Sequence, residues 1–467
     1  SIGSQSTTYN TFYGDSVVNI AEEITNSNLT LGSTIVKIEG MQSAADKLSI
    51  SVVSITYPRS FNFEGKSIFK FKITGGTNKK ILEIENFNGG ISTTQDVFLY
   101  DITNNLRIHC FWNGGKVYAE LPPSAHDRDL VLTNQIYKTS INQVQRANFE
   151  NYTIAQGNYI IITHPSLFTS SVGNNPIFEY AVYRSSTGYT PVIVSIEQLY
   201  DQFAYGIYNH PIAIKNFATY IKQAWQNTPP KYLFLIGKAR IYTECRTYPA
   251  INNLVPTFGF PPSDNLLVAP IGSDVPSIPV GRLAAETGDE VLDYLNKVRL
   301  LEKSATDSLS LENQLWRKRT IQLGGGANAW EQSILKSHLL AMETKMENGK
   351  FGAQVHSFFK DNDSHVDVPN SKMIDSLVNN GVAMVTFFGH GSVKGFDYYL
   401  ADAKHYKNKD KYPLVMALGC YNGTIYQQKK LISEEFIFEK EAGASAYVLS
   451  LIHISEPTRL RRISYAV

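Results

Sequence analysis

Two residues with the chemistry of a nucleophilic site, His390 and Cys420, each follow a short apolar run of the chain. His390 comes after Val382–Phe388, within Gly389-His-Gly-Ser, and Cys420 comes after Tyr412–Leu418, within Gly419-Cys-Tyr-Asn-Gly. An imidazole beside a thiol can draw off the thiol proton and orient the thiolate for attack on a carbonyl carbon. The two residues therefore have the composition of a thiol-dependent acyl-transfer site.

The spacing of these residues predicts that they meet. They lie 30 residues apart, which is about the length of one strand–connection–strand unit. If the two apolar runs are neighbouring parallel strands, about 4.8 Å apart, their carboxyl ends share one edge of the sheet. Both side chains would then project into one crevice.

Glycines beside both residues predict a close approach of the backbone to a substrate. Gly391 follows the histidine and Gly419 precedes the cysteine, and neither has a Cβ to block that approach. The backbone N–H groups of Gly391 and Cys420 are the predicted donors to the developing oxyanion.

Two structural alternatives stay open at this point. A cysteine at a strand end is most often a small buried residue, and a histidine in a glycine-flanked turn is more often a turn or capping residue. The matched positions of His390 and Cys420 raise the weight of catalysis, but residue types and spacing alone leave catalysis and two separate structural roles about equally supported.

Composition limits the kinds of partner and site. The 43 basic and 42 acidic residues nearly cancel, so neither nucleic acid nor an anionic membrane is an expected partner. The 3 cysteines, Cys110, Cys245 and Cys420, are too few and too widely spaced for a disulfide framework or a cysteine metal site. We expect neither a metal nor another cofactor.

The two ends of the sequence raise separate expectations. Ser-Ile-Gly-Ser at the start shows no signal peptide, which predicts that one was removed or that the chain is a fragment. Residues 451–467 resemble the translation of a common sequencing adapter. We therefore expect them to be non-native, with the natural chain continuing differently after Ser450, and we exclude them from the fold prediction.

The first 155 residues show the alternation of antiparallel strands. Ser49–Tyr57, Ser67–Ile73 and Lys79–Ile84 alternate apolar and polar residues and are separated by turn-forming residues. This pattern predicts an all-β, sandwich-like region over residues 1–155.

From Gly157 onward, strand patterns alternate with helix patterns. Such alternation predicts an α/β domain with mostly parallel sheets, which we divide into subdomains at 156–345 and 346–450. The expected strands are 159–163, 232–237, 319–326 (with a turn), 382–388, 412–418 and 444–449, and the expected helices are 212–226, 286–302, 331–346, 373–379 and one around 434–438.

The motifs around His390 and Cys420 resemble those of the gingipain-like cysteine peptidases, a family with a caspase-related α/β fold. An upstream series in the same order supports the resemblance: Tyr205-Gly, Tyr232-Leu-Phe-Leu-Ile-Gly, Val255-Pro-Thr-Phe-Gly, Ser263-Asp-Asn, Ile278-Pro-Val-Gly-Arg-Leu and Lys297. It covers about residues 158–450. The resemblance implies that Cys420 is the nucleophile, that His390 is the general base and then acid, and that no cofactor is required.

Within the family, the β-region and Ile55-Thr-Tyr-Pro-Arg are similar to the surface sortases of the type IX secretion system. This similarity implies an extracytoplasmic enzyme that removes C-terminal sorting signals from exported proteins, with other secretion components at the outer membrane as partners. Two rivals remain: a non-catalytic secretion or adhesion module with the same fold, and a general secreted protease.

The sequence departs from the family in three places. The acidic pocket residue that suits an arginine substrate has no clear match, so the resemblance does not imply arginine specificity. Gingipains have an acidic residue near the turn that matches Gly324-Gly-Gly, where this chain has none, and nearby Glu331 cannot be assigned its role. His390 would then act in a dyad, or another carbonyl or carboxylate would orient it. Lys238 stands where many relatives have Asp, and the sequence does not explain it. Arg282 is expected to bind a carboxylate, and Asp264 to cap a turn.

Overall fold

The computed structural model describes residues 19–25, 35–38, 50, 52–88, 97–134, 147, 149–248, 252–259, 261–306, 310–360, 368–392, 395–419, 425–450 and 463–466. Cys420 and most of the segment 451–467 lie outside these residues. The chain divides into two compact units, 1–144 and 145–467, and each is described separately. Among the described residues, every helix is too short or too polar to cross a membrane.

The N-terminal unit is a seven-stranded sheet in the order β1-β3-β6-β5-β4-β7-β2, antiparallel except for the β1–β3 pair. Phe63 from β1 and Phe69 from β2 stack with their ring centroids 4.2 Å apart, although these strands stand at opposite ends of the order. The sheet therefore curls around one apolar core. Its strands are β1 (Asn62–Lys66), β2 (Ile68–Ile73), β3 (Lys80–Phe87), β4 (Val97–Asp101), β5 (Leu106–Asn113), β6 (Lys116–Leu121) and β7 (Arg128–Asn134).

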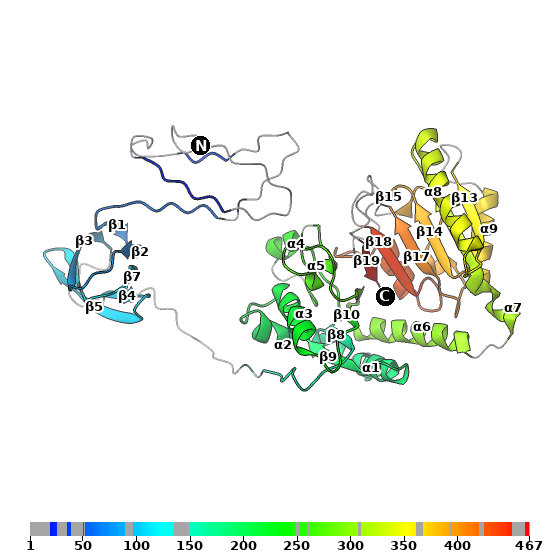
Figure 1. Cartoon of the computed structure of the whole chain (residues 1–467), viewed down its shortest axis with the longest axis horizontal. Coiled ribbons are helices and arrows are strands. Elements are labelled where there is room, and N and C mark those ends of the chain that lie inside the picture. Colours follow the sequence, from blue (N-terminus) through cyan, green and yellow to red (C-terminus); the bar gives the residue numbers. More distant parts are fainter. Residues whose placement is uncertain are drawn as a thin grey trace. The chain divides into compact units, whose positions relative to one another are not determined.

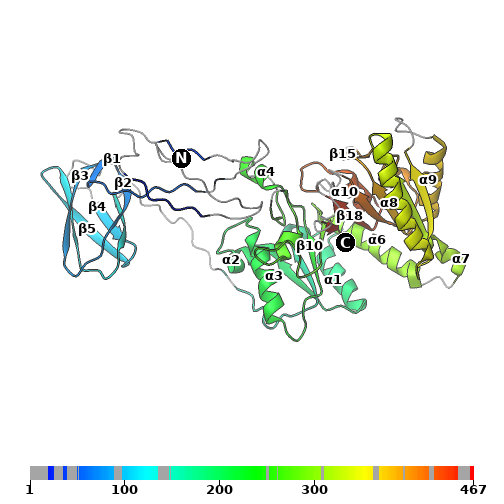
Figure 2. The same cartoon turned by 45° about the horizontal axis from the view of Figure 1, so that its top comes forward.

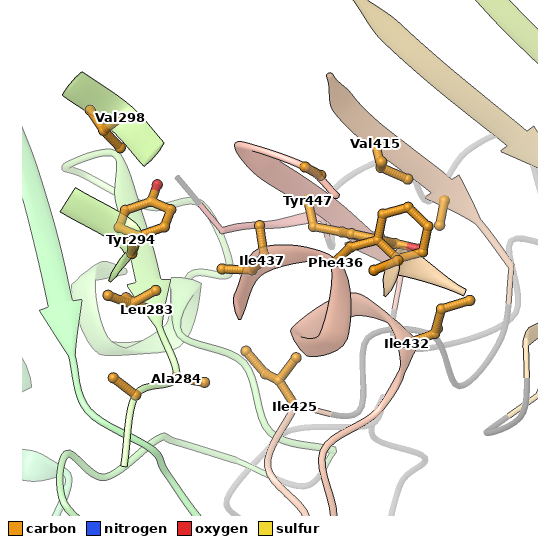
Figure 3. Close-up of a cluster of buried hydrophobic side chains, with 14 of the residues drawn as sticks. Leu283, Ala284, Tyr294, Val298, Val415, Ile425, Ile432, Phe436, Ile437 and Tyr447 are labelled. Atoms are coloured by element: carbon orange, nitrogen blue, oxygen red, sulfur yellow. The ribbon is translucent and has the colours of Figure 1, made fainter. Parts of the chain in front are cut away.

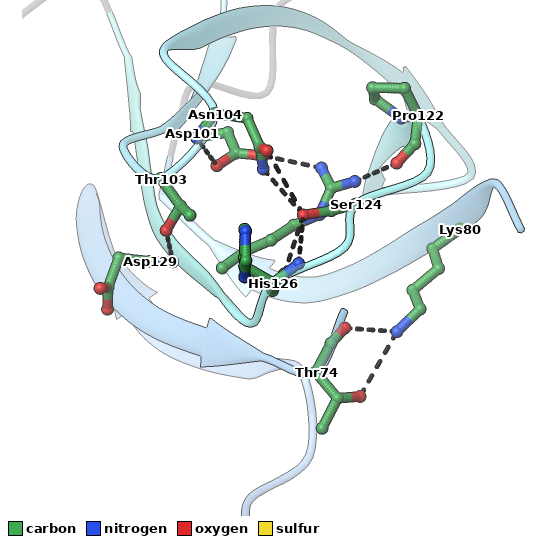
Figure 4. A network of polar contacts seen from close by, with 10 residues as sticks. Thr74, Lys80, Asp101, Thr103, Asn104, Pro122, Ser124, His126 and Asp129 are labelled. Atoms are coloured by element: carbon green, nitrogen blue, oxygen red, sulfur yellow. Dashed lines mark hydrogen bonds and ion pairs between the residues drawn. The ribbon is translucent and has the colours of Figure 1, made fainter. Parts of the chain in front are cut away.

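A buried polar network ties the turns of this sheet together (Figure 4). The Arg128 guanidinium donates to Asp101 Oδ2 at 2.7 Å, and both side chains are almost fully buried. Asn104 Nδ2 donates to the same carboxylate oxygen and to Ser124 Oγ. Each buried charge thus has a partner, which offsets much of its cost of leaving water.

The expected strand at Ser49–Tyr57 is wrong over its described residues. Residues 52–57 have no strand structure, and Val52, Ile55 and Tyr57 are each more than half exposed. Alternation creates a strand only where a neighbouring strand and a core accept its apolar face, and this segment meets neither.

The second unit begins with a four-stranded parallel sheet in the order β11-β10-β8-β9. On one face, Ile160 and Leu233 pack with α2, α3 and α5, while on the other Ile161 and Phe234 join the core that includes α1 and α6. The strands are β8 (Tyr159–Thr163), β9 (Pro191–Ser195), β10 (Tyr232–Ile236) and β11 (Val280–Leu283); the helices are α1 (Pro176–Ser186), α2 (Ile196–Phe203), α3 (Ile212–Ala224), α4 (Tyr242–Thr247), α5 (Asn265–Val268) and α6 (Gly288–Thr306).

Helix α6 leads to a six-stranded sheet (Figures 1 and 2) in the order β13-β12-β14-β17-β18-β19, parallel except for the last pair. Its elements are α7 (Leu311–Gln314), β12 (Arg319–Gly324), α8 (Ala329–Asn348), β13 (Gln354–Phe359), α9 (Val368–Asn380), β14 (Met384–Phe388), β15 (Gly391–Ser392), β16 (Gly395–Phe396), β17 (Leu414–Leu418), α10 (Ile432–Phe438), β18 (Ala446–Ser450) and β19 (Ile463–Ala466). The expected subdomain boundary at 345/346 falls inside α8, and β12, which precedes that helix, already belongs to the six-stranded sheet.

The two α/β sheets share one apolar core around α10. Phe436 and Ile437 of α10 lie with Tyr447 of β18 on one side and Tyr294 of α6 on the other (Figure 3). All four side chains are at least nine-tenths buried. Helix α10 is therefore held by both sheets.

Two buried lysines of the first sheet region make polar contacts with α10 and with the loop after it. Lys238, just after β10, pairs with Glu434, and the two side chains are 1% and 2% exposed. Lys297 Nζ of α6 lies within hydrogen-bond distance of four backbone carbonyls, two in the last turn of α10 (Ile437 O at 2.9 Å) and two in the loop after it (Ala442 O at 2.8 Å). The departure at Lys238 therefore has a structural explanation.

Arg282 binds a carboxylate, as expected. Its guanidinium makes two hydrogen bonds to Asp264, at 2.7 and 2.8 Å, and a third to the Gly237 carbonyl at 2.7 Å. The expected capping role of Asp264 is wrong, because its side chain makes no cap hydrogen bond to α5 and faces Arg282 instead. The bidentate bond to the buried guanidinium occupies both carboxylate oxygens of Asp264.

Candidate active site

The strands before His390 and Cys420 are neighbours, as predicted from their spacing. Strands β14 and β17 pair in parallel with Phe388 opposite Leu418, and Gly389 N–H still reaches the Leu418 carbonyl at 3.4 Å. His390 is two residues past Phe388, and Cys420 is two residues past Leu418. The structure places His390, while Cys420 lies outside the described residues, so their contact stays a prediction.

The His390 ring is paired with a carboxylate that sequence reasoning left unassigned. His390 Nε2 lies 2.9 Å from Glu331 Oε1, and the two side chains are 51% and 28% exposed. A carboxylate only accepts hydrogen bonds, so Nε2 is the donor in this contact. The other ring nitrogen, Nδ1, is therefore the one that can accept a proton from a thiol.

Local capping brings Glu331 to this position. Asn328 caps α8 by accepting the Glu331 N–H at 3.0 Å, and Glu331 is the third residue of that helix. Its Oε2 accepts the Ala327 N–H at 2.8 Å, leaving Oε1 for His390. Burial would raise the pKa of Glu331, but the hydrogen bonds from Ala327 and His390 lower it below its usual 4.5. The carboxylate is thus held as an anion.

A carboxylate from another segment of the chain binds the Gly324-Gly-Gly turn. Asp397, directly after β16, accepts the Gly326 N–H at 2.8 Å and the His390 N–H at 3.0 Å. Sequence reasoning missed Asp397, which is distant from the glycine turn in the sequence, and it named Glu331 without assigning it a role. Asn328 followed three residues later by Glu331 is the pattern of a helix start, and this pattern could have placed Glu331 in the first turn of a helix beside the glycine turn.

The predicted oxyanion donors are only partly described. Gly391 begins the β15–β16 hairpin, opposite Phe396, one residue after His390. The other donor, the backbone of Cys420, lies outside the described residues. The oxyanion site therefore stays a prediction.

The two remaining thiols have surroundings that suppress ionisation. Cys110 lies in the core of the N-terminal sheet, where burial raises the pKa of its thiol to about 12. Burial, and then the nearby Glu244, also raise the pKa of the half-buried Cys245. Since the thiolate is the reactive form, both thiols should react slowly with electrophiles.

Comparison with known proteins gives a family match. The profile described as Peptidase family C25 matches residues 152–461. No curated protein matches the chain significantly.

Three solved structures are similar to the chain. One is titled "Complex of Porphyromonas gingivalis RgpB pro- and mature domains", with 16% identity, a TM-score of 0.46, and coverage of 64% of this chain and 65% of that one. A second is "Crystal structure of the Arg specific cysteine proteinase gingipain R (RGPB)", with 16% identity, a TM-score of 0.44, and coverage of 66% and 64%. A third, "Structure of Protease", has 15% identity, a TM-score of 0.45, and coverage of 62% and 58%. The chain thus spans about three-fifths of each.

Proposed function

Because the chain belongs to peptidase family C25, a family of cysteine-type peptidases, we propose that it cleaves proteins or peptides with Cys420 as nucleophile and His390 as general base. The observation that carries this proposal is the His390–Glu331 pair at the end of β14, beside the strand that leads to Cys420. An imidazole held at one nitrogen by a carboxylate is the arrangement that activates a nucleophile.

The proposed reaction uses only groups of the chain. His390 Nδ1 takes the proton of the Cys420 thiol, and the thiolate attacks the carbonyl carbon of the scissile peptide bond. The N–H groups of Gly391 and Cys420 donate to the oxyanion that forms. His390 then gives its proton to the leaving amine, and water or another amine releases the acyl group from the sulfur. Glu331 stabilises the imidazolium that exists between the two proton transfers.

The finer proposal is that the enzyme acts as a sortase on exported proteins. It rests on the similarity of the N-terminal β-region and Ile55-Thr-Tyr-Pro-Arg to PorU, the surface sortase of the type IX secretion system. On this proposal the enzyme works outside the cytoplasm, removes C-terminal sorting signals, and has other secretion components at the outer membrane as partners.

Covalent labelling tests the peptidase proposal. The full chain is treated with a peptidyl chloromethylketone, and peptide mapping by mass spectrometry compares the labelling rates of the three thiols. Rapid labelling of Cys420 that is lost in His390→Ala supports the proposal, with Cys420→Ala as control for the site. If a folded chain labels Cys420 no faster than Cys110 or Cys245, the proposal is wrong and a non-catalytic module remains.

A second assay separates the sortase from a general protease. A reporter protein is supplied with and without a C-terminal sorting domain, and cleavage of each is followed by mass spectrometry. Cleavage only of the reporter with the domain supports the sortase. Equal cleavage of both reporters supports a general secreted protease.

A further inference from the structure

We propose that Asp397 is a positioning residue that sets the contact between His390 and Glu331, a role that rests on the proposed function. Its carboxylate bridges two loops. One oxygen accepts the His390 backbone N–H at 3.0 Å, and the other accepts the Gly326 N–H at 2.8 Å. The Asp397 N–H in turn donates to the His390 carbonyl at 2.8 Å. His390 is therefore held by Asp397 through both of its backbone polar groups.

The second loop leads directly to Glu331. Gly326 is two residues before Asn328, which caps α8 and fixes the position of Glu331. The Gln332 side chain also donates to the Gly326 carbonyl at 3.2 Å, so the loop and the first turn of α8 are joined. Asp397 thus connects the backbone that carries the imidazole to the backbone that carries its carboxylate partner.

The glycines around Asp397 show that the space is built for its carboxylate. A Cβ on Gly325 would lie 2.0 Å from Asp397 Oδ1, and a Cβ on Gly389 would lie 2.5 Å from the same atom. These distances are far below van der Waals contact, so any larger residue at either position would displace the carboxylate. Two residues without side chains, from two different loops, leave room for one acidic group from a third segment.

A positioning role for Asp397 predicts an effect of its removal that a purely structural role does not predict. If Asp397 only stabilised the fold, its loss would leave the His390–Glu331 hydrogen bond intact in the molecules that remain folded. If it positions the pair, its loss breaks that hydrogen bond. The effect of removing Asp397 should then disappear once Glu331 has been neutralised, because coupled residues are not additive.

The test is NMR of the full chain labelled with ¹⁵N-histidine. The His390 signal, one of 10 histidines, is assigned by its loss in His390→Gln. The ring signals report which nitrogen carries the proton and whether Nε2–H is hydrogen-bonded. We expect Asp397→Asn and Glu331→Gln to abolish the hydrogen-bonded Nε2–H signal alike, with no further change in the double variant. The matched control is Asp402→Asn, because the Asp402 side chain makes no cap hydrogen bond to the turn that follows it.

An unchanged His390 signal in folded Asp397→Asn would overturn the proposal. If that variant does not fold, Asp397→Ser carries the same test, since its smaller side chain leaves room for water beside both N–H groups. Labelling of Cys420 by the chloromethylketone is measured in parallel, and we expect at least a tenfold slower rate in Asp397→Asn. Slow labelling of Cys420 in the unmodified chain would count against the peptidase, while the NMR result would still decide the role of Asp397.

Discussion

Replacing Glu331 by Gln should reduce catalysis without abolishing it. The change keeps the size of the side chain and an oxygen that can accept the Ala327 N–H, but it removes the charge 2.9 Å from His390 Nε2. The contact is partly exposed, so a water-like dielectric sets the lower bound for the lost attraction, about 1.4 kcal/mol. A charge-assisted hydrogen bond sets the upper bound, roughly 3 kcal/mol.

These bounds convert to a fall in kcat/KM of roughly 10- to 150-fold. The fall should appear in kcat, with KM nearly unchanged, because Glu331 stabilises an imidazolium that forms only during the reaction. Since the pKa of Glu331 lies below 4.5 in the folded chain, the contribution is present above that pH and is lost as the pH falls through the lowered value.

The assay is cleavage of a fluorogenic peptide, with Glu347→Gln on the same helix α8 as control. Glu347 accepts the Val355 N–H and is far along the helix from Glu331. A change of less than twofold in kcat/KM for Glu331→Gln would show that His390 works without carboxylate support. A rise in KM with kcat intact would also refute the reasoning.

Three further predictions concern buried charges. Lys238→Met should lower the free energy of unfolding by roughly 3–5 kcal/mol in urea titrations, because it leaves the Glu434 carboxylate buried alone, and adding Glu434→Leu should recover part of the loss. Burial lowers the pKa of Lys297 from 10.5 to about 7, so the unfolded chain binds more protons above pH 7. The native chain should therefore gain roughly 2 kcal/mol of stability between pH 7 and pH 9 relative to Lys297→Met, and parallel pH profiles of the two would contradict this. Arg128→Met should lower the calorimetric melting temperature of the N-terminal unit by leaving Asp101 unpaired, without slowing the labelling of Cys420.

Local patterns predicted the α/β elements well because both sheets are mostly parallel and their strands are largely buried. The run Tyr159–Thr163 is wholly buried, and its continuous apolar pattern has no surface face to interrupt it. The helix expected at 212–226 is observed as Ile212–Ala224. In contrast, the described residues 52–57 of the expected strand Ser49–Tyr57 have no strand structure, because alternation does not show whether a partner strand is present.

The candidate site was predictable only where it follows from strand order. The positions of His390 and Cys420 after apolar runs indicated neighbouring strands, and β14 and β17 are neighbours. Glu331 and Asp397 reach the same place by other routes, one through a helix start and the other through a hairpin. Such contacts depend on tertiary geometry that neither periodicity nor spacing encodes.

The contacts of Lys238 and Lys297 with α10 and the loop after it have a consequence for how the chain folds. A chain that began at β12 would keep both members of the proposed catalytic pair but lose Lys238 and Lys297. Glu434 would then lose the cation with which it pairs, and the backbone carbonyls in the last turn of α10 and in the loop after it would lose the donor they share. The shortest segment that contains the chemistry is therefore not the shortest that folds. The two α/β sheets should therefore unfold in one cooperative transition.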